Sequence, residues 1–553
     1  MPTIQISYSD LIKLIGKQIP MNELKELILL IKGEVDDVEN DIMTVEFESD
    51  RIDMLSVEGI ARTLKGFLGI ETGIPQYWID RWDLTIRVDP SVNSVRPHIV
   101  GAVVTDIELE DNTIAQLMQL QEKLHNTWGR RRRKASIGIY DLKTIQGPIT
   151  YIAKDPKEIK FVPLEESKEM TATEILEEHP KGREFAHLLE KFDKYPLLID
   201  SKGTVLSMPP IINSEDTKVT EKTRNLFIDV TGIDEKTINY ALNVISANLA
   251  ERGAKIFKIL IEYPNREVET PNFEPKKMKL KTDFVNQILG MNLSSEEIIE
   301  LLRKARLDGH LLKDNIIETL IPPYRPDFLH PVDIVEDIAI AYGYNKIEPE
   351  LPNISTIGKE LESETFASLI RDIMVGAGYQ EIRNYIMTNK TVLFDKFMRK
   401  ERPVIEVENP MSILYSVLRD MITPTMLEFL SYNIHVPYPQ RVFEVGEVVI
   451  PSKKAETLSV QELHAAAAIS DVSVSFEDIH STLHYLLKQI KINYYLVEKT
   501  YSYLIKGRSA EILINDTPVG FIGEIHPQVL VNYGLENPVA VFEVNLSKLL
   551  ELS

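Results

Sequence analysis

Apolar residues recur along the chain at two spacings, a helical one of three to four positions and an alternating one typical of strands. The helical spacing predicts helices over 362–376, 413–432 and 475–489 in the last third of the sequence. The segments RVFEVGEVVI and AVFEVNL are rich in β-branched and aromatic residues, as strands are. Helices and strands mixed in this way predict an α+β fold.

The chain contains a repeat at an offset of 274 residues. A helix-like segment that ends at Gly16 matches one that ends at Gly290, and R-x-D-x-L at 51–55 matches R-x-D-x-L at 325–329. Apolar periodicity alone could relate any two units of this kind, but it predicts neither a shared glycine nor a shared R-x-D-x-L. We therefore expect two copies of one small α/β module, which need not perform the same task.

Segments rich in proline and polar residues divide the 553 residues further. VDPSVNSVRP precedes β-rich sequence, EYPNREVETPNFEPKK precedes the second copy of the repeat, and ISTIG follows it. The chain is therefore expected to be multidomain, with regions at 1–88, 89–265, 272–350 and 358–553.

Composition removes several classes of function. The chain has no cysteine, which excludes disulfides, thiolate metal sites and a cysteine nucleophile. A net charge of −22 argues against one broad basic surface for DNA or an anionic membrane, although a local basic patch is compatible with it. No apolar stretch approaches the roughly 18 residues of a membrane span, and the first residues do not resemble a targeting leader. We expect a soluble, cytoplasmic protein with no membrane partner.

Four carboxylates, those of Asp327, Asp333, Glu336 and Asp337, surround a helix start predicted at Pro331. Spacings of three and four residues place the last three on neighbouring parts of one helical face. Oxygen ligands of this kind suit a hard cation such as Mg²⁺. Acidic residues at a helix start also complement the helix dipole while facing solvent, and spacing alone favours that alternative.

A run of five cations interrupts the otherwise acidic chain, at Arg130, Arg131, Arg132, Arg133 and Lys134. Such a run can bind phosphates by electrostatic attraction. Equally, most charge runs are solvated or pair with nearby acids.

The segment VLSMPPIINSEDTKVTEKTRNLFIDVTG gathers polar side chains around prolines and a strand. Loops of this composition can hydrogen-bond a small polar ligand, but Asn, Ser and Asp beside proline also form turns without any ligand. The candidate pocket residues are Ser207, Asn213, Asp229 and Thr231.

His480 and His484 lie four residues apart on a predicted helix, as a zinc pair would. The glutamate of a metalloprotease helix does not stand between them. The chain also has no phosphate-binding loop, no dinucleotide-binding glycine motif and no serine-hydrolase elbow.

Taken together, these segments resemble the β subunit of phenylalanyl-tRNA synthetase of the archaeal and eukaryotic cytosolic type, and the resemblance covers essentially the whole chain. It is carried by SDRIDMLSVEGIARTLKG, LHNTWGRRRRKASIGIYDL, SMPPIINSEDTKVTEKTRNLFIDVTG, PYRPDFLHPVDIVEDIAIAYGYNKI, and NPMSILYSVLRDMITPTMLEFLSYN followed by FEVGEVV.

The resemblance implies an identity for each region: an N-terminal B1-like module, a B3/B4 tRNA-editing domain, a B5 domain, and a C-terminal domain similar to the class II synthetase antiparallel-sheet core. It implies a Mg²⁺ site shared with an α subunit, at Asp327, Asp333, Glu336 and Asp337, which reverses the preference drawn from spacing. The glycine-rich final motif of class II catalysis is missing, so no residue of this chain is expected to catalyse adenylation. ATP would be a substrate of an (αβ)₂ heterotetramer that binds tRNA(Phe).

The implied function is a subunit of an aminoacyl-tRNA ligase. The chain would support attachment of phenylalanine to tRNA(Phe) by the α subunit and hydrolyse mischarged Tyr-tRNA(Phe) itself. An alternative is a non-catalytic assembly and nucleic-acid-binding scaffold whose editing pocket is vestigial. A third hypothesis is an independent metal-dependent hydrolase that uses His480 and His484.

Overall fold

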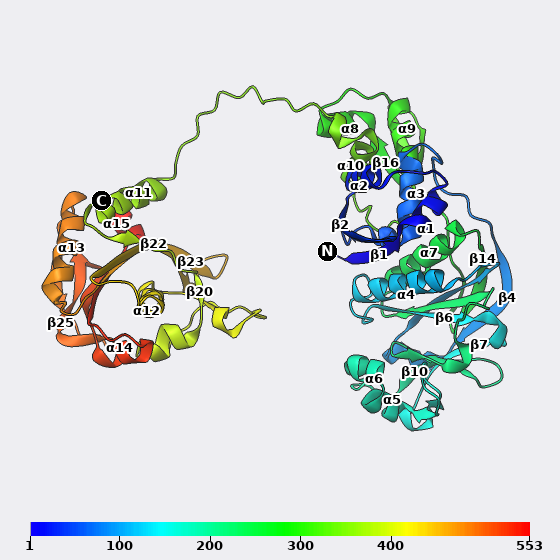
Figure 1. The fold of residues 1–553 in the computed structure, drawn as a ribbon, viewed down its shortest axis with the longest axis horizontal. Coiled ribbons are helices and arrows are strands. Elements are labelled where there is room, and N and C mark those ends of the chain that lie inside the picture. Colours follow the sequence, from blue (N-terminus) through cyan, green and yellow to red (C-terminus); the bar gives the residue numbers. More distant parts are fainter. Residues whose placement is uncertain (1, 553) are drawn as a thin grey trace. The chain divides into compact units, whose positions relative to one another are not determined.

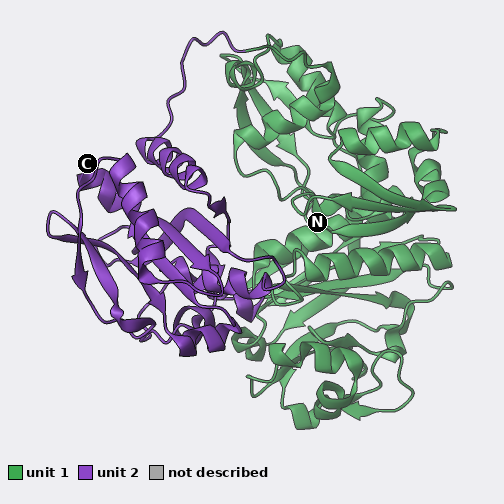
Figure 2. Ribbon diagram, turned by 60° about the vertical axis from the view of Figure 1, so that its left-hand side comes forward, with its two compact units in different colours: residues 1–351 green, residues 352–553 purple. Residues whose placement is uncertain are grey.

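The computed structural model describes residues 2–552, which form two compact units, 1–351 and 352–553 (Figure 2). Both units contain helices and sheets, so the expected α+β class is confirmed. Across residues 2–552, no helix has the length and apolar character needed to cross a membrane.

The two repeat copies have the same order of elements and the same sheet topology. In each, three strands form a sheet with the third strand in the middle, β1-β3-β2 in the first copy and β16-β18-β17 in the second. The first copy comprises β1 (Thr3–Ser7), α1 (Tyr8–Ile15), α2 (Met21–Leu30), β2 (Gly33–Glu39), β3 (Ile42–Phe47) and α3 (Val57–Phe67). The second comprises β16 (Lys276–Lys281), α8 (Thr282–Leu289), α9 (Ser295–Lys304), β17 (Asp308–Leu311), β18 (Ile316–Ile321) and α10 (Pro331–Tyr342). The predicted pair of related modules is therefore confirmed.

The shared glycine of the repeat has a local cause. Gly16 ends α1 with φ at +75°, and Gly290 ends α8 with φ at +69°. In this left-handed conformation a side chain is disfavoured, so glycine is the residue that closes both helices.

The two R-x-D sequences meet where the copies contact each other. Arg51 Nε lies 2.9 Å from Asp53 Oδ1, and Arg325 Nη2 lies 2.6 Å from Asp327 Oδ2. Arg325 also binds Asp337, Nη1 to Oδ2, at 3.0 Å. Both arginines are buried, and the charges of Arg51 and Arg325 hold the pKa of Asp53 well below its ordinary value. The repeated sequence thus forms a charge network between the two copies.

The chain between the two copies forms a ten-stranded sheet of mixed direction, in the order β12-β11-β10-β7-β4-β14-β5-β13-β6 with β15 paired to β14. Its strands are β4 (Ile79–Val88), β5 (His98–Thr105), β6 (Ala135–Asp141), β7 (Ile149–Lys154), β10 (Tyr195–Ile199), β11 (Val205–Met208), β12 (Ile212–Asn213), β13 (Leu226–Gly232), β14 (Lys255–Tyr263) and β15 (Arg266–Thr270). The helices α4 (Asp111–Asn126) and α7 (Glu235–Glu251) lie along one face of the sheet (Figure 1). A small subdomain holds β8 (Lys160–Phe161), β9 (Met170–Thr171), α5 (Ala172–Glu178) and α6 (Pro180–Phe185).

The second unit is built on a seven-stranded sheet, β19-β22-β23-β27-β26-β25-β24, in which only β19 pairs in parallel. The long strands of this sheet are β22 (Gln440–Pro451), β23 (Ser459–Ser470), β25 (Leu504–Ile514), β26 (Thr517–Ile525) and β27 (Val539–Asn545), and its short strands are β19 (Gln380–Glu381) and β24 (Tyr495–Glu498). The short strands β20 (Met387–Thr388) and β21 (Val417–Leu418) form a separate two-stranded sheet. Its helices are α11 (Glu362–Gly376), α12 (Thr423–Tyr432), α13 (Phe476–Gln489), α14 (Pro527–Tyr533) and α15 (Leu546–Leu552).

One helix prediction in this unit is too long. The helix expected over 413–432 begins only at Thr423, after a short 3-10 turn and strand β21. Pro424 stands in the first turn of α12, where its missing N–H costs nothing, whereas inside a longer helix it would remove a hydrogen bond. The helices predicted over 362–376 and 475–489 are confirmed as α11 and α13.

Candidate functional site

The candidate site is built on β13, a fully buried strand that pairs with β5 on one side and with the end strand β6 on the other. Side chains alternate along a strand, so Phe227, Asp229 and Thr231 share one face of β13. Ile228 and Val230 point to the opposite face and join the apolar core under α4 and α7. The alternation thus places a carboxylate and a hydroxyl together inside the protein.

The neighbouring strand β6 makes room for the carboxylate. Asp229 is opposite Gly138, and Thr231 is opposite Ser136. A Cβ atom at Gly138 would lie 2.3 Å from Asp229 Oδ1 and 2.1 Å from the Tyr140 hydroxyl oxygen. Any side chain at Gly138 would therefore displace the two polar groups.

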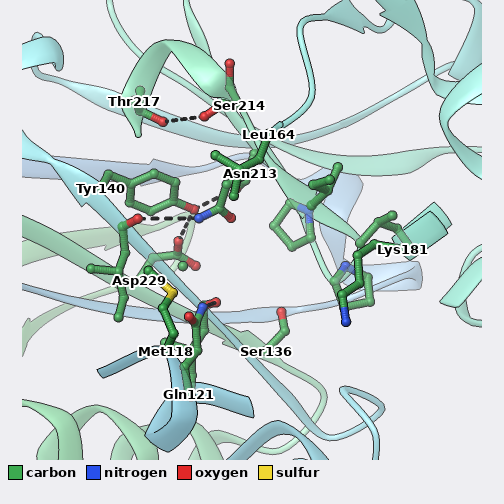
Figure 3. Close-up of a pocket in the computed structure, with 18 of the residues that line it drawn as sticks. Met118, Gln121, Ser136, Tyr140, Leu164, Lys181, Asn213, Ser214, Thr217 and Asp229 are labelled. Carbon is green, nitrogen blue, oxygen red and sulfur yellow. Dashed lines mark hydrogen bonds between the residues drawn. The ribbon is translucent and has the colours of Figure 1, made fainter. Parts of the chain in front are cut away.

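A cavity of about 370 Å³ opens at this point (Figure 3). Three of the four residues predicted to form a pocket, Ser207, Asn213 and Asp229, line it. Ser207 and Asn213 are paired across the hairpin of β11 and β12, which faces β6 and β13. Apolar wall residues include Ile114, Met118, Ile137, Ile139, Leu164, Pro209 and Pro210. The cavity is thus mostly apolar with a few convergent polar groups, as ligand sites usually are.

The Tyr140 hydroxyl joins the two strands of polar residues at the base of the cavity. It donates to Asp229 Oδ1 at 2.5 Å and lies 2.8 Å from Ser207 Oγ. Figure 3 shows Tyr140, Asn213 and Asp229 facing one another. Sequence reasoning did not include Tyr140 among the candidate pocket residues. Gly138, two residues earlier on the same face of β6, is the sequence signal that a polar group packs there.

Burial controls the ionisation of this group. It raises the pKa of Asp229 to about 7, and the hydrogen bond from Tyr140 and the charge of Arg96 limit the rise. Burial and the nearby Asp229 raise the pKa of Tyr140 well above its ordinary value, so Tyr140 stays a proton donor. A carboxyl group that titrates near neutral pH in a cavity is a frequent feature of functional sites.

Thr231, the fourth predicted pocket residue, lies on the same face but outside the cavity lining. Its hydroxyl accepts a bond of 2.9 Å from Arg96 Nε and lies 3.1 Å from Ser136 Oγ, and Ser136 does line the cavity. Arg96 also donates to the Thr231 carbonyl at 2.7 Å. Burial lowers the pKa of Arg96 to about 10. Thr231 therefore positions Arg96 and Ser136 rather than facing the cavity.

A second wall of the cavity comes from α4 and the turn that follows it. Arg132 donates to the Ile211 carbonyl at 2.8 Å and to Glu122 Oε1 at 2.7 Å. His125 Nε2 accepts from the Ile137 amide at 2.8 Å, and burial lowers the pKa of His125 to about 4. This histidine is neutral at physiological pH, so it contributes no positive charge to the wall.

The structure divides the run of cations. Arg132 is buried against the cavity wall, whereas Arg130, Arg131 and Arg133 are exposed and Lys134 is half-buried. The exposed arginines line a separate hollow beside the first cavity.

The four carboxylates predicted to bind magnesium each have a protein partner. Asp327 and Asp337 both bind Arg325. Asp333 caps α10 by accepting from the amides of 329 and 330, and Glu336 Oε1 lies 3.2 Å from Lys32 Nζ of the other repeat copy. As they lie, these carboxylates do not converge, and residues 2–552 contain no group of three or more His, Asp or Glu side chains placed to hold a metal ion. The magnesium site stays a prediction, which requires Asp327 and Asp337 to leave Arg325.

His480 and His484 share one partner instead of a metal. The hydroxyl of Tyr494 lies 2.9 Å from His480 Nε2 and 3.2 Å from His484 Nδ1. Their rings are 6.3 Å apart, centroid to centroid. The absence of any group of three potential ligands over residues 2–552 leaves the metal-dependent hydrolase without structural support.

In the second unit, Arg441 and Glu444 of β22 lie on opposite faces, as residues three apart on a strand must. Glu444 pairs with Arg419 at 2.7 Å, and both are buried. Arg441 is exposed. The sequence QRVFEVGE therefore does not bring its arginine and glutamate together.

Comparison with known proteins covers the whole chain. Family models match at residues 347–546 ("Phenylalanyl tRNA synthetase beta chain CLM domain"), 278–344 ("tRNA synthetase B5 domain") and 110–258 ("B3/4 domain"). The phenylalanine–tRNA ligase β subunits of Pyrococcus furiosus and Korarchaeum cryptofilum are 42% and 44% identical, and each match covers 99% of this chain and 100% and 98% of the relative. A crystal structure of an N-terminal fragment of the phenylalanyl-tRNA synthetase β subunit from Pyrococcus horikoshii is 43% identical, covers 62% of this chain and 99% of the fragment, and has a TM-score of 0.60.

Proposed function

Because the chain belongs to the family of phenylalanine–tRNA ligase β subunits, we propose that it hydrolyses mischarged Tyr-tRNA(Phe) in the cavity beside Asp229. The observation that carries this proposal is the cavity itself. It is about 370 Å³ in volume and mostly apolar, with Ser207, Asn213 and Asp229 converging in it. It also lies within the region that the B3/4 family model matches. An intact polar pocket favours editing over a scaffold with a vestigial pocket.

The need for such a pocket follows from the substrates. Tyrosine is phenylalanine with one added hydroxyl, and an apolar synthetic site rejects an added hydroxyl by only about 10²-fold. A second site that hydrogen-bonds the phenol discriminates far better, because phenylalanine would leave its buried polar groups unpaired. Asn213 and Asp229 supply an amide and a carboxyl for this purpose.

The hydrolytic step is assigned to water. The Ser207 hydroxyl is hydrogen-bonded to the Tyr140 hydroxyl, which burial keeps protonated. Because a protonated tyrosine is not a base, Tyr140 does not activate this serine as a nucleophile. We infer that the pocket positions a water molecule against the ester, together with the terminal hydroxyls of the tRNA. In this scheme Asp229 and Asn213 orient the amino-acid part, and the apolar walls limit the access of bulk solvent.

Attachment of phenylalanine is assigned to an α subunit in an (αβ)₂ complex. The expected ligands of that complex are ATP, Mg²⁺ and tRNA(Phe), and its expected compartment is the cytoplasm. The regions 1–88, 89–265, 272–350 and 358–553 are assigned to the B1-like, B3/B4, B5 and class II-like domains. The Mg²⁺ ligands within this chain are assigned to Asp327, Asp333, Glu336 and Asp337.

The test of editing is deacylation of Tyr-tRNA(Phe) by the assembled complex. Asp229→Ala is expected to slow hydrolysis while phenylalanine charging continues. Asp216→Ala is the matched control, because Asp216 is exposed on the neighbouring loop and does not line the cavity. Wild-type hydrolysis by the Asp229→Ala complex would refute the assignment.

The assignment of adenylation is tested by ATP–pyrophosphate exchange with phenylalanine. Exchange is expected only when an α subunit is present, in a complex of (αβ)₂ mass. Robust exchange by this chain alone would show that its second unit is catalytic.

A further inference from the structure

Three successive arginines adopt a backbone conformation that side chains rarely take. Arg130, Arg131 and Arg132 have φ angles of 49°, 53° and 61°, all in the left-handed region. Each such residue costs roughly 1–2 kcal/mol relative to the right-handed conformation. Backbone hydrogen bonds hold the turn, among them Arg132 N to His125 O at 3.0 Å and Lys134 N to Gly129 O at 2.8 Å. Strain of this kind persists where the surroundings enforce it, often at functional sites.

The left-handed turn sends the arginine side chains in two directions. Arg132 points to the wall of the first cavity and bonds to the carbonyls of Pro210 and Ile211. Arg130, Arg131 and Arg133 instead line a second cavity of about 460 Å³.

The second cavity carries a concentrated positive charge. Besides the three arginines, Lys191 and the buried Arg96 line it, and His187 and Phe192 are also part of the wall. Over residues 2–552, none of Arg130, Arg131, Arg133 and Lys191 forms an ion pair, whereas Arg132 pairs with Glu122. On a chain with a net charge of −22, four cations without acidic partners around one hollow form a local anion site.

The two cavities are neighbours. Pro210 lines both, and Arg132 donates to its carbonyl from the arginine turn. Their linings therefore adjoin at Pro210. We infer that the second cavity binds the phosphodiester backbone of the single-stranded 3′ end of tRNA while the terminal aminoacyl ester lies in the first. This inference rests on the proposed editing function.

The chemistry of the second cavity fits single-stranded RNA. Guanidinium groups bind phosphate oxygens in a bidentate manner, and several of them can follow successive phosphates. Phe192 is half-buried in the wall, where its ring can stack on a base without reading its identity. The cavity thus distinguishes a tRNA end from a free amino acid ester by the presence of a backbone.

The test replaces Arg130, Arg131 and Arg133 with glutamine in the full chain assembled with its α subunit. Glutamine removes the charge and keeps a Cβ at each position. The control is the triple variant Lys157→Ala, Lys168→Ala and Lys202→Ala. These lysines are exposed in the same domain, line neither cavity and, within the described part of the chain, form no ion pair.

Two substrates separate backbone binding from ester hydrolysis. Tyr-tRNA(Phe) carries the phosphates, whereas 3′-O-tyrosyl-adenosine carries only the terminal nucleoside. The arginine variant is expected to lose roughly tenfold or more in kcat/KM on Tyr-tRNA(Phe), mainly through KM, with the nucleoside ester hydrolysed at the wild-type rate. The control is expected to match wild type on both substrates.

A binding measurement makes the result independent of hydrolysis. For an acceptor-stem RNA hairpin with a single-stranded 3′ end, the slope of log Kd against log salt is expected to fall by about 0.7 per lost phosphate contact, or about 2 for the triple variant. A slope equal to that of wild type would overturn the inference. If the wild-type complex hydrolyses neither substrate but the slope still falls, the editing function fails and the phosphate site stands.

Discussion

Replacing Asp229 with asparagine tests the electrostatics of the cavity directly. Asp229 is buried, and burial raises its pKa from 3.8 to about 7. In the unfolded chain the same carboxyl ionises near pH 4, so ionisation favours unfolding. Stability is therefore lost as pH rises between about 4 and 7. Asparagine has nearly the same shape and does not titrate.

The magnitude follows from the pKa difference. Each pKa unit corresponds to about 1.36 kcal/mol, so ionisation of Asp229 costs the folded state about 4 kcal/mol at pH 8. At pH 5 the loss of stability is about 1.7 kcal/mol, because pH 5 lies only about one unit above the pKa of the unfolded chain and Asp229 is still protonated in the folded state. The Asp229→Asn variant should gain roughly 2.5 kcal/mol relative to wild type on going from pH 5 to pH 8.

The assay is native-state hydrogen exchange of peptides that cover β13, with exchange corrected for its intrinsic pH dependence. The quantity compared is the opening free energy of wild type and variant at pH 5 and pH 8. A multidomain chain has no single unfolding free energy, so a local measurement is required. If the difference between variant and wild type is the same at both pH values, the raised pKa of Asp229 is wrong.

Four further predictions concern other groups. Tyr140→Phe removes the hydrogen-bond donor to Asp229, so it should lower the opening free energy of β13 by about 1–3 kcal/mol. It should also slow deacylation of Tyr-tRNA(Phe), and unchanged values of both quantities would refute the role of Tyr140. Arg325→Ala leaves the buried Asp337 and the partly buried Asp327 without their arginine, so it should cost about 3–5 kcal/mol in the opening free energy of α10 measured by hydrogen exchange. Arg303→Ala at an exposed pair should cost less than about 1 kcal/mol, and equal losses would contradict the network. Asp337→Asn should lower the magnesium content of the dialysed complex by elemental analysis, and full retention would argue against this carboxylate as a ligand. His480→Ala should leave the metal content unchanged, and a loss of bound metal would revive the hydrolase hypothesis.

The repeat and much of the pocket could be predicted from the sequence. Glycine at a helix end and R-x-D-x-L are local sequence features, so they can be recognised in both copies of the repeat, and both copies have the same fold. Asp229 and Thr231 share a strand face because side chains alternate, which sequence spacing shows. Ser207 and Asn213 required only that the hairpin between them fold back on itself.

What the sequence could not show is the set of partners that long-range packing chooses. Spacing placed Asp327 and Asp337 near each other but did not reveal that Arg325 would bind both. Tyr140 of β6 contacts Asp229 of β13 and Ser207 of β11, two strands that are distant from β6 in the sequence. The arginine run looked uniform, and only the left-handed turn separates Arg132 from its neighbours. The helix predicted over 413–432 begins ten residues later, at Thr423, because the spacing of apolar residues does not show that Pro424 lies in a first helical turn.

The most direct test of the central claim is the ratio of Tyr-tRNA(Phe) to Phe-tRNA(Phe) hydrolysis by the assembled wild-type complex. A cavity that recognises the phenol through polar groups predicts hydrolysis of Tyr-tRNA(Phe) well above the uncatalysed rate, with Phe-tRNA(Phe) left nearly intact. Equal rates for the two, or rates no higher than without protein, would contradict an editing site beside Asp229.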